Sequence, residues 1–223
     1  DIYLKLKLKK NIKFISNLVL RTEKLFYKFK KKIDIKKIFY IEGDYIWGRK
    51  HKLFGWRSKI KNYSLILGAA IHIVDLVFFM TNQKPVSVFT VGSDKLTSNT
   101  SYKKKSFILM ILEYKSGLIV KISANGVANY PHFHELKIFS ENQTLLHSSL
   151  GTAEVKKNNL KLLKLNYPDK KNRKNLIQNF IDTIINKKTK PIISLKEQFD
   201  TMSVCLSAEK SLKLKKKIKI NYL

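Results

Sequence analysis

The chain has 223 residues and is 44% hydrophobic, which allows a sizeable core and argues against wholesale disorder. Its 45 Lys and Arg residues outnumber 16 Asp and Glu residues, and the net charge of +29 would attract phosphates, nucleic acid or anionic lipid. The excess positive charge comes mostly from lysines spread along the chain, and Asn and Ile are also abundant. We therefore attribute the charge to the codon usage of an AT-rich genome in preference to nucleic-acid binding.

Cysteine content and the N-terminus indicate a cytoplasmic protein. Cys205 is the only cysteine, which excludes an intrachain disulfide, and its apolar surroundings predict a small buried side chain. No signal peptide is recognisable, and a start at Asp1 suggests a fragment of a longer protein. The apolar run Leu65–Ile71 is too short to span a bilayer and is followed by polar side chains, so a buried helix is expected.

The first third of the chain predicts two strands and two helices. Asp1–Lys13 alternates Leu and Lys and is compatible with a frayed helix or a strand. Strands are expected at Lys13–Leu20 and Lys37–Tyr45. Between them, apolar residues four apart predict an amphipathic helix over Glu23–Ile33. After a loop, a second helix is expected over 65–81, with Ser64 or Asn62 as its cap.

The remainder predicts a run of strands followed by two helices. The expected strands are Val86–Val91, Ser106–Tyr114, Leu118–Asn125, Glu135–Phe139, Thr144–Ser148 and, at the tail, Lys217–Tyr222. The first closing helix has an apolar stripe that includes Leu176 and Ile184. The second begins with a capping box of Ser194 and Glu197. Consecutive strands with flanking helices predict an α+β fold with an open, mainly antiparallel sheet.

Several strings, in this order and spacing, resemble the Gfo/Idh/MocA family of NAD(P)-dependent oxidoreductases. They are FISNLVLRTEKLF (14–26), IFYIEGDYIWGR (38–49), GWR (55–57), LILGAAIHIVDLVFF (65–79), FILMILEYKSGLIVKISAN (107–125), HFHELKIF (132–139), NFIDTIIN (179–186) and KEQFDTMSVCLSAEKSL (196–212). The resemblance implies oxidation or reduction of a hydroxyl or carbonyl group on a sugar, cyclitol or nucleotide-sugar with NAD or NADP.

The resemblance also implies a domain division. Residues 1–36 would be the last strand and helix of a truncated Rossmann domain, and residues 37–223 the C-terminal substrate-binding and oligomerisation domain. The family's Gly-rich dinucleotide turn and its Glu-Lys-Pro motif are absent from the sequence. The cofactor would therefore be bound mainly by a missing N-terminal domain, and the chain alone is expected to be inactive. A non-catalytic binding or dimerisation module remains the alternative.

His72 is the candidate catalytic residue. Gly68, His72 and Asp75 form the only polar stripe of an otherwise apolar helix. An imidazole in such a stripe can take a proton from a substrate hydroxyl, and the resemblance places His72 at the family's catalytic histidine. Asp75 is expected to orient the ring or contact substrate. Many family members carry Asp where this chain has Gly68, so Gly68 is expected to leave room for substrate.

Three further residues are candidates for substrate binding. Arg57 and Arg21 could each hold a phosphate or carboxylate, and Trp56 could contribute to the floor of a sugar site. For both arginines a surface position is the alternative. His132 and His134 would project from one strand face, but without a third ligand a structural pair is favoured and no metal site is predicted. A homo-oligomer is expected to form through the sheet, because its central strands carry more apolar surface than the helices can cover.

Overall fold

The computed structural model describes residues 13–222, so the expectation for residues 1–12 lies outside the described residues. Its helical elements are η1 (Val19–Thr22), α2 (Lys24–Lys32), η2 (Ile35–Lys37), α3 (Lys50–Phe54), η3 (Trp56–Lys59), the π-helical η4 (Ile66–Ala70), α4 (Ile71–Thr81), α5 (Asn172–Ile185) and α6 (Leu195–Leu214). Its strands are β1 (Ile38–Ile46), β2 (Pro85–Ser93), β3 (Phe107–Tyr114), β4 (Ile119–Asn125), β5 (Phe133–Ser140), β6 (Gln143–Ser148), β7 (Gly151–Lys156), β8 (Asn159–Leu162) and β9 (Ile218–Lys219).

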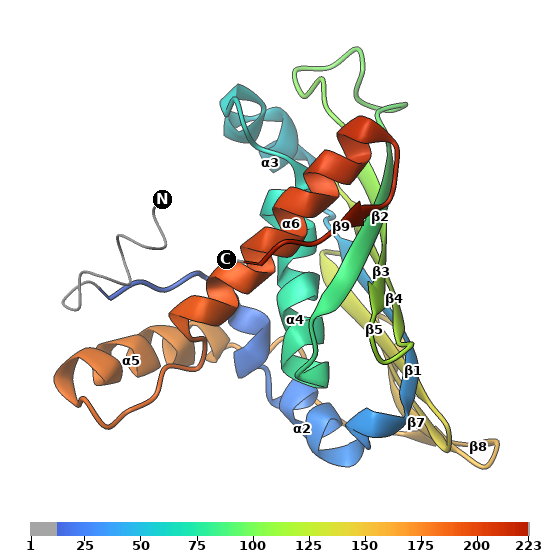
Figure 1. Cartoon of the computed structure of the whole chain (residues 1–223), viewed down its shortest axis with the longest axis vertical. Coiled ribbons are helices and arrows are strands. Elements are labelled where there is room, and N and C mark those ends of the chain that lie inside the picture. Colours follow the sequence, from blue (N-terminus) through green and yellow to red (C-terminus); the bar gives the residue numbers. More distant parts are fainter. Residues whose placement is uncertain (1–12, 223) are drawn as a thin grey trace.

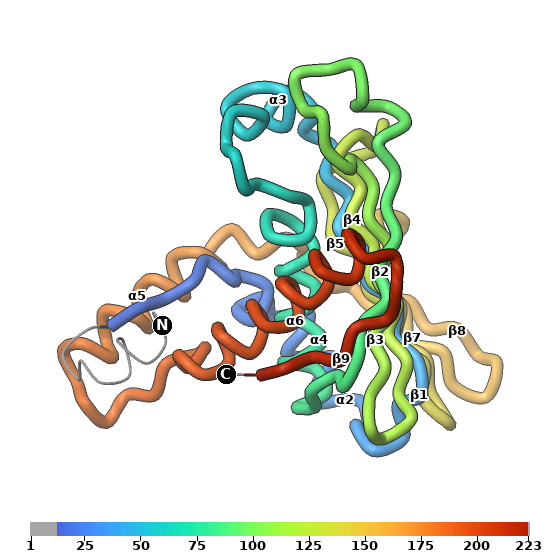
Figure 2. Tube along the Cα trace, turned by 45° about the horizontal axis from the view of Figure 1, so that its top comes forward, coloured from blue at the N-terminus to red at the C-terminus, as the bar shows by residue number. Residues whose placement is uncertain are grey.

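Within the described residues the strands form one nine-stranded sheet in the order β8-β7-β6-β5-β1-β4-β3-β2-β9. Every neighbouring pair is antiparallel except β1 and β4, which run parallel. All the labelled helices lie on the same side of the sheet in two views (Figures 1 and 2). This arrangement confirms the predicted α+β fold with an open, mainly antiparallel sheet.

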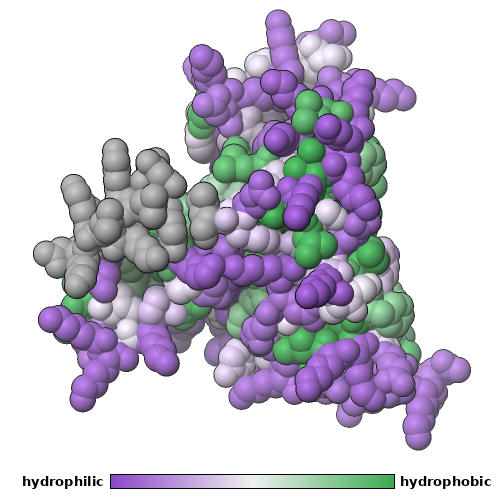
Figure 3. Space-filling model, in the orientation of Figure 1, coloured by the Kyte–Doolittle hydropathy of each residue, from purple (hydrophilic) through white to green (hydrophobic). Residues whose placement is uncertain are grey.

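The core lies between the sheet and the two central helices. Alternate residues of β4 point into it, as the period of two in its sequence predicts. β3 also buries alternate residues, although its sequence is apolar on both faces and predicts a central, covered strand. From the helix side, α4 is buried along most of its length, because nearly every one of its residues is apolar. The face of the molecule seen in Figure 3 is hydrophilic over much of its area, with the predicted lysine-rich surface around this core.

Two expectations about local structure are wrong. Residues 13–20 form no strand but an extended segment and the 3-10 turn η1, because no described strand runs beside them to complete a ladder. The predicted loop 46–63 contains the short helices α3 and η3. Strands β7 and β8, at one end of the sheet, were not predicted, because they are only six and four residues long and give too short a pattern to separate from a loop.

The two closing helices differ in how they contribute to the core. Ser194 and Glu197 form the predicted capping box at the start of α6, and Cys205 is fully buried on its inner face, where burial raises the pKa of the thiol. Helix α5 extends away from the sheet (Figures 1 and 2). Of its apolar stripe only Leu176 is buried, while Ile177 and Ile184 are about half exposed.

Among the helices of residues 13–222, none combines the length and the apolar character that a membrane span requires.

Candidate functional site

His72 lies where the π-helical turn η4 passes into α4. Its ring stacks on Tyr45 at the end of β1, with centroids 5.7 Å apart. The Nδ1 atom of His72 is buried and has no hydrogen-bond partner. Buried polar atoms without partners are uncommon in native folds, and they mark places where a ligand or water completes the hydrogen bonding. His72 therefore presents an unsatisfied nitrogen at the junction of helix and sheet.

Further histidines and tyrosines gather around Tyr45. His134 is its ladder partner on β5, and the two rings meet edge to face at 4.6 Å. His134 Nδ1 is hydrogen-bonded to the hydroxyl of Tyr167, whose ring in turn contacts His147 at 4.5 Å. The sequence gave no reason to select Tyr167 or His147, because each is placed here by strand pairing and by a long connection. We call His72, Tyr45, His132, His134, Tyr167 and His147 the aromatic cluster.

Burial lowers the pKa of every histidine in the aromatic cluster. For His72 it falls from its usual 6.5 to about 4, mainly through burial and secondarily through the positive charges of His132 and Arg173. Burial likewise lowers the pKa of His132 and His147 to about 4, and it holds the pKa of His134 well below its usual value. At neutral pH the imidazole of His72 is therefore uncharged, which is the form that can accept a proton from a hydroxyl group.

His132 and His134 form a ring pair. Their centroids are 5.1 Å apart in an edge-to-face arrangement, and both rings also contact Tyr45. Within residues 13–222 no group of three or more His, Cys, Asp or Glu side chains is placed to hold a metal ion.

Asp75 and Arg21 are placed differently from the expectation. The guanidinium of Arg21 donates through Nε to both carboxylate oxygens of Asp75 at 3.0 Å and through Nη2 at 2.7 Å. A fourth hydrogen bond joins Arg21 to Glu197 at the start of α6. Asp75 is fully buried and Arg21 is 5% exposed. The expectation that Asp75 orients His72 is wrong, because its carboxylate is bonded to Arg21, a partner 54 residues away in the sequence.

Arg57 and Trp56 lie next to each other on the short helix η3. The guanidinium of Arg57 packs over the rings of Trp56 and Trp47 at 4.1 and 4.6 Å, which holds it by cation–π contact. Its Nη1 atom is buried and has no hydrogen-bond partner. Trp56 is 58% exposed, so its outer face remains available to a ligand. Arg57 thus keeps one unsatisfied donor on the same side of the sheet as His72.

The space beside Gly68 is filled. A Cβ atom at this position would clash with the hydroxyl end of the Tyr63 ring. The expectation that Gly68 leaves room for substrate is therefore wrong in this structure, because the loop before η4 places Tyr63 there.

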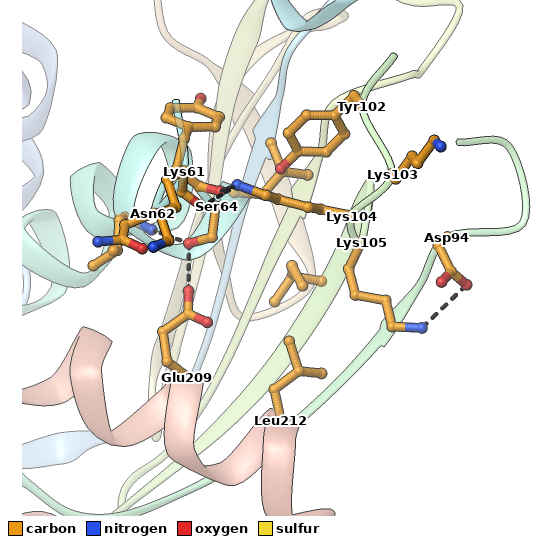
Figure 4. Close-up of a pocket in the computed structure, with 14 residues that line it drawn as sticks. Lys61, Asn62, Ser64, Asp94, Tyr102, Lys103, Lys104, Lys105, Glu209 and Leu212 are labelled. Atoms are coloured by element: carbon orange, nitrogen blue, oxygen red, sulfur yellow. Dashed lines mark hydrogen bonds and ion pairs between the residues drawn. The ribbon is translucent and has the colours of Figure 1, made fainter. Parts of the chain in front are cut away.

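A separate hollow of about 500 Å³ lies between this loop, the 94–105 loop and α6 (Figure 4). Several of its polar groups are paired: Lys105 bonds to Asp94, and Ser64 donates to Glu209. The ammonium of Lys104 donates to three backbone carbonyls at 2.7–3.0 Å, those of Ile60, Lys61 and Tyr63, and so holds the loop that carries Tyr63. The hydroxyls of Tyr63 and Tyr102, which also line this hollow, are buried without a hydrogen-bond partner.

Comparisons with known proteins agree with the sequence resemblance. A family model described as the GFO/IDH/MocA C-terminal domain matches residues 31–146, more than half of the chain. In a comparison with curated protein sequences no significant match is found.

Solved structures show the same fold at low sequence identity. Myo-inositol 2-dehydrogenase from Lactobacillus plantarum superimposes with a TM-score of 0.80 at 17% identity, over 96% of this chain and 67% of that protein. Scyllo-inositol dehydrogenase from Lactobacillus casei, solved with NAD(H) and scyllo-inositol, gives 0.77 at 13% identity, over 97% and 67%. UDP-N-acetylglucosamine 3-dehydrogenase from Acidithiobacillus ferrooxidans gives 0.71 at 16% identity, over 88% and 60%. The chain thus spans about two thirds of the length of these proteins or less.

Proposed function

The chain belongs to the GFO/IDH/MocA family, and from this premise we propose that it is the substrate-facing part of an NAD(P)-dependent dehydrogenase. The enzyme would oxidise a hydroxyl group, or reduce a carbonyl group, on a sugar, cyclitol or nucleotide-sugar. The names of the structurally similar enzymes indicate substrates of this kind. One observation carries the proposal: His72 is neutral, stacked on Tyr45, and has a buried nitrogen without a partner.

The chemistry assigned to this chain is proton transfer and substrate orientation. His72 accepts the proton of the substrate hydroxyl as the carbon is oxidised, and returns it in the reverse direction. Arg57 and the exposed ring of Trp56 bind the remainder of the polyol. A nicotinamide group would supply the hydride acceptor. Arg21 and Asp75 do not contact the substrate in this proposal. Their hydrogen bonds, with that of Arg21 to Glu197, hold α4 against η1 and α6.

We propose that NAD or NADP is bound mainly by an N-terminal domain outside this sequence. Residues 1–36 would be the end of that domain and residues 37–223 the substrate domain. The sequence has no G-x-G-x-x-G turn, whose backbone would approach the pyrophosphate of a dinucleotide. The residues of this chain therefore do not provide the usual pyrophosphate-binding turn. The exposed isoleucines of α5 support the division, because a projecting helix with an uncovered apolar face suits packing against a further domain. The buried, unpaired Cys205 suits the proposed cytoplasmic location.

Calorimetric titration of NAD(H) tests this division. The 223-residue chain is expected to give no saturable heat even at high cofactor concentration, because it lacks the backbone cradle for the pyrophosphate. The same chain joined to a nucleotide-binding domain is expected to bind. Saturable binding by the chain alone would show that the cofactor site lies within these residues.

A non-catalytic binding module is the second candidate, and one observation favours it. The Tyr63 ring occupies the space beside Gly68, one turn before His72, where a substrate was expected to fit. On this alternative the chain would bind a polyol without oxidising it.

We further propose that the uncovered face of the sheet joins two copies of the chain. Paired positions form a row across this face: Phe89, Ile111, Lys121, Glu42, Lys137, Leu146, Ala153 and Leu162. The row is apolar at both ends, and the charges at its centre are paired, Lys137 with Glu42 and Lys121 with Asp44. Apolar surface of this kind commonly marks an interface, and a self-complementary face suits a two-fold dimer.

A charged substitution on this face tests the oligomer. Leu109→Asp adds a charge beside the apolar strip of β2 and β3, and is expected to convert the oligomer to monomer in light scattering. Leu206→Asp on the outer side of α6 is the matched control, because Leu206 is exposed but lies away from the sheet. A wild-type chain that is monomeric at all concentrations, or a Leu109→Asp variant with unchanged mass, would contradict the proposal.

A further inference from the structure

The hollow beside α6 has the size of a small-molecule site. Its volume of about 500 Å³ lies within the range of about 300–1,000 Å³ that is usual for ligand pockets. Its walls come from three segments that are far apart in the sequence: the loop before η4, the 94–105 loop and α6 (Figure 4). Lys104 ties the first two walls together through its hydrogen bonds to the carbonyls of residues 60, 61 and 63. The shape of the hollow is therefore set by fixed contacts.

Tyr102 contributes to this hollow a buried hydroxyl that has no hydrogen-bond partner among the described residues. The residue is 0% exposed, and Figure 4 shows its hydroxyl directed inward, toward the side chain of Lys104. Such groups are uncommon in native folds, and they mark places where a ligand or a water molecule completes the hydrogen bonding. Burial raises the pKa of Tyr102, and Tyr63 and Glu209 add to the rise, so the hydroxyl keeps its proton and can donate.

Glu209 supplies an acceptor close to that donor. Its Oε1 atom accepts from Ser64, while its Oε2 atom accepts no hydrogen bond from residues 13–222. The carboxylate lies near enough to Tyr102 for its charge to act on the phenol. A ligand hydroxyl needs one acceptor and one donor, and Glu209 Oε2 and Tyr102 Oη supply both. This part of the hollow is therefore suited to a hydroxyl group.

The rest of the lining is partly apolar and partly basic. Its apolar side chains, besides the two tyrosine rings, are Leu65, Leu67, Ile108 and Leu212. Its charged side chains are the lysines at 61, 103, 104 and 105 and the carboxylates of Asp94 and Glu209. Lys105 is paired with Asp94, but Lys61 and Lys103 are exposed and form no ion pair with the part of the chain that the structure describes. Their charges attract an anionic group to the mouth of the hollow.

We propose that this hollow binds a small organic anion that has an apolar body and, away from its charged group, a hydroxyl group. The ligand hydroxyl accepts from Tyr102 and donates to Glu209, and the apolar body packs against the aliphatic side chains of the walls. The anionic group lies at the mouth, between Lys61 and Lys103. This site goes beyond the proposed function, because His72, Arg57 and Trp56 are not among its lining residues.

Titration of the 223-residue chain with three related compounds tests the site. 4-Hydroxyphenylacetate has all three features, phenylacetate lacks the hydroxyl, and tyramine carries an ammonium group in place of the carboxylate. Binding is followed by calorimetry and by NMR of protein labelled at the tyrosine Cζ carbons, in which a Tyr102→Phe variant identifies the Tyr102 signal. We expect saturable binding of 4-hydroxyphenylacetate with a shift of that signal, about tenfold weaker binding of phenylacetate, and no binding of tyramine.

Two variants with matched controls assign the contacts. Tyr102→Phe should weaken binding of 4-hydroxyphenylacetate about tenfold while the melting temperature stays equal or rises, because an unsatisfied hydroxyl is lost. Tyr114→Phe is its control, since Tyr114 is buried at the other end of β3 and does not line the hollow. Lys103→Met should weaken binding of both acids about three- to fivefold. Lys95→Met, in the same exposed loop but outside the lining, should not.

The outcomes decide for or against the site. No saturable binding of 4-hydroxyphenylacetate, or equal binding of tyramine, would overturn the inference. Equal weakening in a variant and its control would also overturn it, because the effect would then be one of general packing or net charge. Lys103→Met changes an exposed side chain, so it keeps the test decisive if Tyr102→Phe folds poorly. His72→Ala should leave this binding unchanged, and a loss there would place the ligand elsewhere and contradict the inference.

Discussion

Arg21→Met is expected to lower the free energy of unfolding by about 3–5 kcal/mol, because it leaves the Asp75 carboxylate buried without its partner. Arg21 makes three hydrogen bonds to Asp75 and a fourth to Glu197, and so joins η1, α4 and α6. The side chains of Arg21 and Asp75 are at most 2% exposed. Urea unfolding measures the loss. A loss below about 1 kcal/mol would mean that the ion pair contributes little.

The loss should also depend on pH. Burial raises the pKa of Asp75 to about 6 even beside Arg21, and removal of Arg21 raises it further. A carboxyl whose folded pKa lies above its unfolded value stays protonated in the folded state while the unfolded state ionises, so stability falls as pH rises from about 4 through the folded pKa. The free energy of unfolding lost in the Arg21→Met variant should therefore be smaller at pH 5 than at pH 8.

Two control variants isolate the buried charge. Arg21→Met/Asp75→Asn removes the charge together with its partner and should recover part of the loss. Lys137→Met breaks the ion pair with Glu42, where both side chains are partly exposed, and should cost no more than about 1 kcal/mol. An equal loss in Arg21→Met and Lys137→Met would contradict the special role of the buried pair.

His72→Ala is expected to lower kcat about 10²–10⁴-fold in a protein that joins the chain to a nucleotide-binding domain. The reason is that His72 is neutral and carries a buried, unsatisfied nitrogen, as a proton acceptor for the substrate hydroxyl requires. Cofactor affinity should be nearly unchanged, because under the proposed domain division the nucleotide-binding domain would bind the pyrophosphate. Steady-state kinetics and a cofactor titration on the same preparation measure both quantities.

A structural histidine would give a different pattern. Loss of the stacking on Tyr45 would then lower the melting temperature, while the rate per folded molecule stayed within a few-fold of the wild type. His51→Ala is the matched control, because His51 lies exposed on α3, and it should change neither quantity. A His72→Ala variant that is less stable but equally fast would contradict the catalytic assignment.

Patterns with a local physical cause predicted most of the fold correctly. Alternation in β4, the four-residue spacing of α2 and the capping box of α6 are properties of neighbouring residues, and the structure confirms them. The strand expected at 13–20 is wrong because a strand also needs a partner, which its own residues cannot reveal. The stripe on α5 is genuine, but the sequence does not say that most of it stays uncovered.

The site was predictable only where its residues lie on one element. His72 was singled out by the polar stripe of its helix, which is a local pattern, together with the family resemblance. The partner of Asp75 is Arg21, and the occupant of the space beside Gly68 is Tyr63, and neither contact follows from helical spacing. Tyr167 reaches His134 through a connection of 33 residues, which no periodicity encodes.

Dehydrogenase activity of the chain joined to a nucleotide-binding domain tests the central claim most directly. Myo-inositol, scyllo-inositol and UDP-N-acetylglucosamine are supplied with NAD or NADP, and reduced cofactor is measured for the wild type and for His72→Ala. The account predicts oxidation of at least one of these substrates, lost by about 10²–10⁴-fold in the variant. A folded, cofactor-loaded wild-type protein that oxidises none of them, or a His72→Ala protein as fast as the wild type, would contradict it.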